Sequence, residues 1–133
     1  MTISQSITIK TSPAKVYQAI ISAEQFSDVT GAPAEIASEE GGEFSCFGGQ
    51  ITGRHLELIP DQRIVQAWRV KAWPDGVFSE VRFDISASGD ATTLELTHTG
   101  YPDDAAEHLE PGWHKMYWDP LKKPTLKDRN LSV

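Results

Sequence analysis

The N-terminal part of the chain changes from a strand pattern to a helix pattern. Residues 3–10 alternate polar and apolar side chains, which is typical of a half-buried strand. Ser12 is a good helix N-cap, the proline after it suits a first helical position, and apolar residues then recur at helical spacing. These signals predict a helix over Pro13–Ile21. Ser22, with glutamine three residues later, resembles a capping box and predicts a second short helix that runs through residues 24–26 and is ended by Gly31 and Pro33.

Residues 34–100 have the pattern of consecutive strands separated by turns. The breaks contain Gly-Gly, Pro-Asp, Pro-Asp-Gly and Ser-Gly-Asp, whose residues accept turn dihedral angles. Alternation is clearest at Val81, Phe83 and Ile85, which share one face. The spacing is that of an antiparallel meander. The predicted strands cover residues 34–38, 43–47, 51–59, 64–71, 77–87 and 91–99.

The apolar pattern returns to helical spacing after residue 102. Pro111 fits the first turn of a helix better than its interior, so we expect residues 103–110 to form a separate helical turn leading into this helix. Pro120 removes a helix hydrogen bond, so we expect a kink or an early end there, with Pro124 closing the element. The stripe that covers the sheet consists of Leu109, Trp113, Met116, Tyr117 and Leu121.

One domain, residues 1–133, accounts for the whole pattern, because no linker, repeat or low-complexity segment interrupts it. The element order predicts an α+β fold in which a curved antiparallel sheet of about seven strands closes around a long C-terminal helix, with two short helices after the first strand. The single cysteine, Cys46, cannot form an internal disulfide, and there is no export signal and no apolar run long enough to cross a membrane. We therefore expect a cytoplasmic protein without membrane insertion; the sequence leaves its oligomeric state open.

The charge of the chain argues against nucleic acid as a partner. The formal net charge is -7 and the pI is about 5.0, so the chain repels phosphate backbones, which are bound by clustered Lys and Arg. The basic residues Lys122, Lys123, Lys127 and Arg129 lie near the end of the predicted last helix. We interpret them as complementing the helix dipole, the alternative being a docking patch for an acidic partner.

Short motifs in a characteristic order run along nearly the whole chain. They are Gly41-Gly42-Glu43-Phe44, Gly49 through Thr52-Gly53, Ile59-Pro60 with Arg63-Ile64-Val65, Trp68-Arg69, Thr97-His98-Thr99-Gly100 and Gly112-Trp113. With these motifs the chain resembles the SRPBCC superfamily of helix-grip domains, which includes START domains and the birch-pollen allergen. More closely, it resembles the homologues of the activator of heat-shock-protein-ninety ATPase, in particular that activator's C-terminal domain. The resemblance implies a helix-grip fold and a heat-shock-protein-ninety-type chaperone as a possible partner, with a role in stress response.

A sheet that curls around a helix encloses a space, and an apolar space with a few polar groups is a default ligand site. We expect the small residue Gly112 to let the helix approach the sheet closely. Ordinary core packing is the alternative role for every residue on the facing elements. The candidate lining consists of Trp68, Phe83, Leu96, His98, Trp113, Met116 and Tyr117.

His98 is the most informative polar candidate, because it shares the strand parity of Leu94 and Leu96 and so should point inward. A buried neutral imidazole can orient a ligand or exchange a proton near neutral pH. The alternative is a structural histidine bonded to a backbone carbonyl or to Tyr117.

No catalytic constellation stands out. The four histidines show no metal-binding spacing, Cys46 has no histidine or basic residue near it in sequence, and the Gly-rich turns lack the strand-to-helix setting of a phosphate loop. We expect no metal and no cofactor. Three functions stay open: a non-catalytic domain that binds a small apolar or amphipathic ligand, a partner of a heat-shock-protein-ninety-type chaperone, and an enzyme of the cyclase or dehydratase kind that uses His98.

Overall fold

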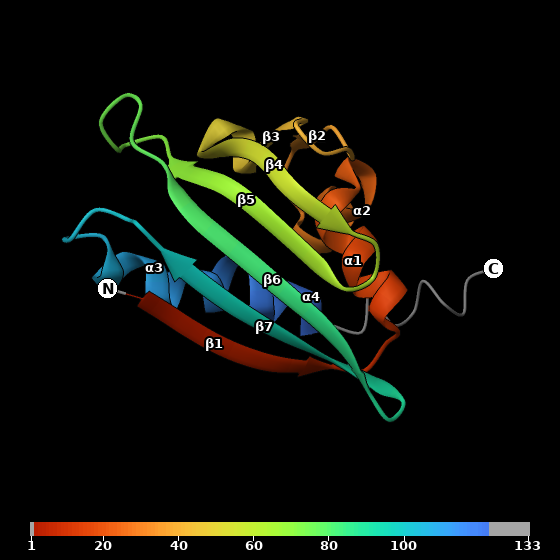
Figure 1. Cartoon of the computed structure of the whole chain (residues 1–133). Coiled ribbons are helices and arrows are strands. Elements are labelled where there is room, and N and C mark those ends of the chain that lie inside the picture. The colour runs from red at the N-terminus through yellow and green to blue at the C-terminus, as the bar shows by residue number, and fades with distance from the viewer. Residues whose placement is uncertain (1, 123–133) are drawn as a thin grey trace.

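A seven-stranded antiparallel sheet curves around a C-terminal helical segment in the computed structural model, which describes residues 2–122 (Figure 1). The order across the sheet is β1-β7-β6-β5-β4-β3-β2, so the first two strands in sequence form its two edges. This confirms the predicted fold class, and the predicted strands agree with the observed ones to within about two residues. The strands are β1 (Thr2–Ile9), β2 (Ala34–Ile36), β3 (Glu43–Cys46), β4 (Ile51–Ile59), β5 (Arg63–Val70), β6 (Ser79–Ser88) and β7 (Ala91–Thr99).

Two short helices follow the first strand, as predicted. Helix α1 (Pro13–Ile21) has the predicted bounds, and the Ser12 hydroxyl accepts a hydrogen bond from the backbone N–H of Lys15 at 3.3 Å. Helix α2 (Ala23–Thr30) ends, as predicted, at Gly31, which adopts a left-handed conformation with φ of 75°. Glycine has no Cβ to oppose that conformation, and it therefore closes the helix.

The described part of the C-terminal segment is helical through both of its prolines, Pro111 and Pro120. It consists of α3 (Ala106–Trp113), the π-helical turn η2 (His114–Trp118) and α4 (Asp119–Lys122). Pro111 lies inside α3, so the expected helix start at Pro111 and the separate turn before it were wrong. The expected early end at Pro120 does not occur either. Pro124 and the basic residues Lys123, Lys127 and Arg129 lie outside the described residues.

The irregularity expected at Pro120 lies in the turn before it. The backbone N–H of Asp119 bonds to the carbonyl of His114, five residues back, which is the π-helical pattern. Because one extra residue widens this turn, the helix can continue into Pro120, which has no N–H to donate. Two successive residues of this turn, Tyr117 and Trp118, are buried.

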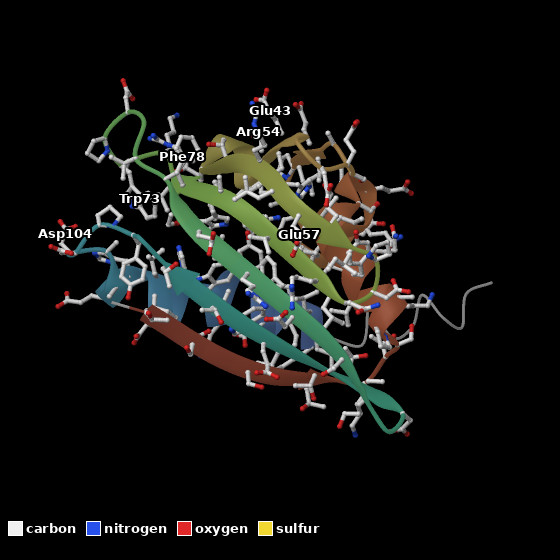
Figure 2. All side chains as sticks on the ribbon, in the orientation of Figure 1. Glu43, Arg54, Glu57, Trp73, Phe78 and Asp104 are labelled. Carbon is white, nitrogen blue, oxygen red and sulfur yellow. The ribbon has the colours of Figure 1, made fainter. Side chains whose placement is uncertain are left out.

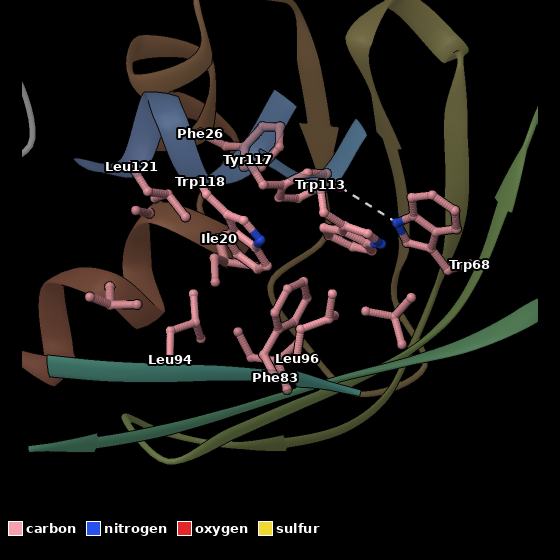
Figure 3. Close-up of a cluster of buried hydrophobic side chains, with 14 of the residues drawn as sticks. Ile20, Phe26, Trp68, Phe83, Leu94, Leu96, Trp113, Tyr117, Trp118 and Leu121 are labelled. Atoms are coloured by element: carbon pink, nitrogen blue, oxygen red, sulfur yellow. Dashed lines mark hydrogen bonds between the residues drawn. The ribbon is translucent and has the colours of Figure 1, made fainter. Parts of the chain in front are cut away.

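The core lies between the concave face of the sheet and the helices, and it is rich in aromatic side chains (Figure 3). Trp118, in the π-helical turn, is fully buried and was not part of the predicted apolar stripe. At Gly53 of β4 the packing excludes any side chain, because a Cβ there would lie 1.9 Å from the carbonyl oxygen of Ala67. Within residues 2–122, no helix is both long enough and apolar enough to cross a membrane.

Candidate ligand-binding site

An apolar cavity of about 210 Å³ lies between strands β4 and β5 and the helical segment α3–η2. Its inner wall is aromatic, and polar side chains occur only at its rim, where Gln50 and His108 are exposed. Gly112 of α3 lines this space, and a Cβ added there would meet nothing within 4 Å. Gly112 therefore leaves room beside the sheet instead of allowing the close helix approach that we expected. The lining consists of Gln50, Ile51, Trp68, Val70, His108, Leu109, Gly112, Trp113, Met116 and Tyr117.

The inner wall of the cavity belongs to a continuous array of aromatic rings. Trp113 stacks on Trp68, with centroids 5.3 Å apart, and on Trp118, with centroids 5.5 Å apart. Tyr117 lies against Trp113 at 4.4 Å, and Trp73 meets the edge of Trp68 at 5.9 Å. All four tryptophans of the chain thus belong to one cluster. Each ring of the array packs against at least one other aromatic ring, and such pairs stabilise the cavity wall.

His98 lies behind this wall and links the helix to the sheet. The indole N–H of Trp113 donates to His98 Nδ1 at 3.1 Å. His98 Nε2 lies 2.7 Å from the hydroxyl of Ser79, and that hydroxyl donates to the backbone carbonyl of Trp68 at 2.8 Å. An indole nitrogen only donates, so Nδ1 must be the unprotonated nitrogen and Nε2 carries the hydrogen that is donated to Ser79. These hydrogen bonds therefore assign to His98 the neutral tautomer that carries its hydrogen on Nε2.

The surroundings of His98 favour this neutral form. Its side chain is fully buried, and desolvation lowers its pKa to about 4. At neutral pH both ring nitrogens are thus engaged with protein groups. The partners differ from the backbone carbonyl or Tyr117 that the sequence suggested, but the arrangement has the character of the structural alternative.

Two further ionisable groups near the cavity stay protonated at neutral pH. The Tyr117 hydroxyl accepts a hydrogen bond from the indole N–H of Trp68 at 3.5 Å (Figure 3), and burial raises its pKa. Burial also raises the pKa of the Cys46 thiol to about 12, so this residue is an inert packing group. Neither group is a nucleophile under ordinary conditions. Among residues 2–122, no cluster of three or more His, Cys, Asp or Glu side chains has an arrangement that holds a metal ion.

The seven predicted lining residues divide into two groups. Trp68, Trp113, Met116 and Tyr117 line the cavity. The structure places Phe83, Leu96 and His98 in the packed core beside it, with exposed fractions of 0%, 1% and 0%. Leu109 and Gly112 were not in the predicted lining, although the helical spacing already placed Leu109 on the buried stripe. Ile51 and Val70, opposite each other at the ends of β4 and β5, had no such signal.

A larger hollow of about 590 Å³ lies on the outer side of β2, β3 and β4, and we do not take it as the ligand site. It is open to solvent and includes the exposed ion pair of Arg54 with Glu43, at 3.4 Å, and the half-exposed ring of Phe78 (Figure 2). Small-molecule sites are lined mainly by apolar and aromatic side chains, whereas the lining of this hollow includes the charged side chains of Glu35, Glu43 and Arg54. The smaller cavity is the better candidate for that reason.

The family model described as "Activator of Hsp90 ATPase homolog 1-like protein" matches residues 10–124 of the chain. Among curated proteins, the chain is 30% identical over 116 residues to the human protein named activator of 90 kDa heat shock protein ATPase homolog 1. It is 36% identical over 112 residues to the corresponding homolog of Dictyostelium discoideum. These matches cover 87% and 84% of this chain but only 34% and 29% of the relatives. The chain thus spans about a third of the length of the relatives it matches.

Solved structures show the same fold. The crystal structure of an HSP90 activator from Plasmodium falciparum matches with a TM-score of 0.84 and 25% sequence identity. The match covers 90% of this chain and 91% of that one.

Proposed function

The chain belongs to the family of activator of Hsp90 ATPase homolog 1-like proteins, and from this premise and its apolar cavity we propose that it is a non-catalytic domain that binds a small apolar or amphipathic molecule. The observation that carries the proposal is the unfilled space in front of Gly112. Small-molecule sites are concave and lined mainly by apolar and aromatic side chains with a few polar groups, and this space of about 210 Å³ has that character.

The size and polarity of the cavity indicate the kind of ligand. An engineered apolar cavity of about 150 Å³ binds benzene, so this cavity suits a molecule of one or two rings or a short alkyl chain. The apolar body of the ligand would lie against Trp68, Trp113 and Tyr117. A polar end would point to the rim, near Gln50 and His108. Flat rings would gain most, because they can stack on the indole walls.

Gly112→Leu tests this proposal by filling the cavity. The new side chain extends into space that holds no atom within 4 Å of the added Cβ, and it improves helix propensity by about 1 kcal/mol. We expect the variant to fold at least as stably as the wild type and to lose ligand. Glu110→Leu is the matched control, because Glu110 lies on the same helix, is exposed and does not line the cavity.

Native mass spectrometry with a panel of fatty acids and one- and two-ring aromatic compounds, indole among them, provides the measurement. Support requires added mass on the wild type and on the Glu110→Leu control but not on Gly112→Leu. The proposal fails if no member of the panel adds mass to the wild type, or if Gly112→Leu retains the ligand.

We propose as a second candidate that the chain contacts a chaperone of the Hsp90 type. The observation that favours it is the name shared by the curated relatives, activators of a 90 kDa heat shock protein ATPase. The test is the ATP turnover of a purified Hsp90-type chaperone with this protein in large excess. Unchanged turnover together with no detectable binding would rule the second candidate out and would leave the ligand proposal untouched.

A further inference from the structure

The two edges of the sheet are built differently. β2 is three residues long and carries the exposed Glu35, so it offers little to pair with. β1 is eight residues long and contains no charged residue and no proline. Natural proteins usually protect long edge strands with charges, prolines or a covering element, because unpaired N–H and C=O groups bind other strands. Across residues 2–122, no strand pairs with the outer edge of β1 (Figure 1).

The sequence of β1 is symmetric about its centre. Residues 2–8 are Thr-Ile-Ser-Gln-Ser-Ile-Thr, which is the same in either direction from Gln5. Two copies that pair antiparallel about a two-fold axis at Gln5 therefore place identical residue types opposite each other. Ser4 of one copy lies opposite Ser6 of the other, and Thr and Ile pair in the same way. Such hydroxyl and β-branched pairs stabilise a sheet, and no like charges meet.

β1 is also held in place before any pairing. The side-chain amide of Gln5 donates to the carbonyl of Glu110 at 3.1 Å and accepts from the indole N–H of Trp118 at 2.5 Å. Ile3 and Ile7 are buried against the core, with exposed fractions of 2% and 7%. A strand fixed in this way loses little conformational entropy when a partner pairs with its edge.

We propose that a second copy of this chain binds along β1, antiparallel and with the two-fold axis at Gln5, so that the two seven-stranded sheets join into one. The interface is isologous, as in most homodimers. The paired segment of seven residues spans about 24 Å and buries mainly backbone, so the dimer is weak and forms at high protein concentration. Neither the apolar cavity nor a chaperone takes part in this contact.

Charge substitutions at Ser4 and Ser6 test both the dimer and its register. Both side chains are exposed in the single chain, so substitutions there leave the core intact. In the double variant Ser4→Lys with Ser6→Lys, lysines meet across the two-fold axis and the dimer is lost. In Ser4→Lys with Ser6→Glu, each lysine meets a glutamate of the second copy and the dimer is kept or strengthened. Ser86→Lys with Ser88→Lys adds the same charge at exposed positions of β6 and serves as the control.

Sedimentation velocity over a range of protein concentrations measures the oligomeric state of all four proteins. We expect dimers for the wild type, the lysine–glutamate variant and the β6 control, and a monomer for the variant with two lysines in β1. A wild type that is monomeric at its highest soluble concentration would overturn the proposal. So would a two-lysine β1 variant that dimerises like the wild type, or a lysine–glutamate variant that is monomeric.

Discussion

Two histidines lie fully inside this protein, and their surroundings differ. His98 has a partner at each ring nitrogen, the indole N–H of Trp113 and the hydroxyl of Ser79. His55 has one long contact, 3.5 Å from its Nδ1 to the amide nitrogen of Gln66, and its Nε2 has no hydrogen-bond partner in the part of the chain that the structure describes. Burial is the same for both, with an exposed fraction of 0%. Equal burial thus accompanies two different roles.

The difference follows from position in the fold. His98 stands where the helix meets the sheet, and it passes a hydrogen bond from one to the other. His55 lies on β4, where a bulge follows it, and its ring stacks on Phe44 with centroids 5.4 Å apart. We infer that hydrogen bonding dominates the contribution of His98 to stability and that ring packing dominates that of His55. Four predictions test this contrast.

The largest expected effect is on the pH dependence of stability. The pKa of His98 is about 4 in the folded protein and about 6.5 in the unfolded chain. Between these values the unfolded chain binds a proton that the folded protein does not, so stability falls as the pH is lowered from 6.5 to 4, by up to about 3 kcal/mol. Burial lowers the pKa of His55 as well and adds a change of the same sign. Urea unfolding across this pH range measures the fall, and His98→Phe should remove most of it.

Replacing His98 by Phe at pH 7 should destabilise the fold by about 2–3 kcal/mol. The substitution keeps a ring in the core but leaves the indole N–H of Trp113 buried without an acceptor. Urea unfolding provides the value. If the variant were as stable as the wild type, the hydrogen bonds that His98 makes with Trp113 and Ser79 would have no structural role.

Trp113→Phe should cost about 1–2 kcal/mol, because it removes the same hydrogen bond from the other side and some packing. It should also raise the pKa of His98, since Nδ1 then loses its donor and is free to take up a proton. NMR titration of the imidazole follows this change. A His98 pKa that stays near 4 would show that desolvation alone sets it.

The smallest effect is expected for His55→Phe, which should change stability by less than about 1 kcal/mol in either direction. The substitution retains the stack on Phe44 and removes a buried nitrogen that has no partner among the described residues. The same His-to-Phe change thus has two outcomes at two equally buried sites. A loss of stability in His55→Phe as large as that in His98→Phe would contradict the proposed difference between the two histidines.

The sequence predicted most of the fold because local patterns carried it. The N-cap at Ser12 and the proline after it placed α1 without error, and the alternation in the last two strands placed the buried face. The C-terminal helix was predicted in the right place but with wrong irregularities. The rule that an interior proline kinks or ends a helix applies to a regular α-helix, and the turn before Pro120 is a wider π-helical turn.

The candidate site was predicted only in part. Strand parity and helical spacing identify which residues face inward, and Trp68, Trp113, Met116 and Tyr117 do line the cavity. Parity gives no information on whether an inward residue borders a cavity or packed neighbours, so Phe83 and Leu96 could not be separated from them. That distinction depends on how far the helix lies from the sheet.

The sequence by itself determined the element order, the inward faces and the burial of His98, because each follows from the period of apolar residues along the chain. Only the tertiary structure decided which groups form hydrogen bonds with His98 and where the apolar cavity lies relative to it. Those partners are Trp113, 15 residues away, and Ser79, 19 residues away on another strand. Contacts over such separations depend on the curvature of the sheet and on how the C-terminal helix packs against it, and neither is encoded in a local pattern.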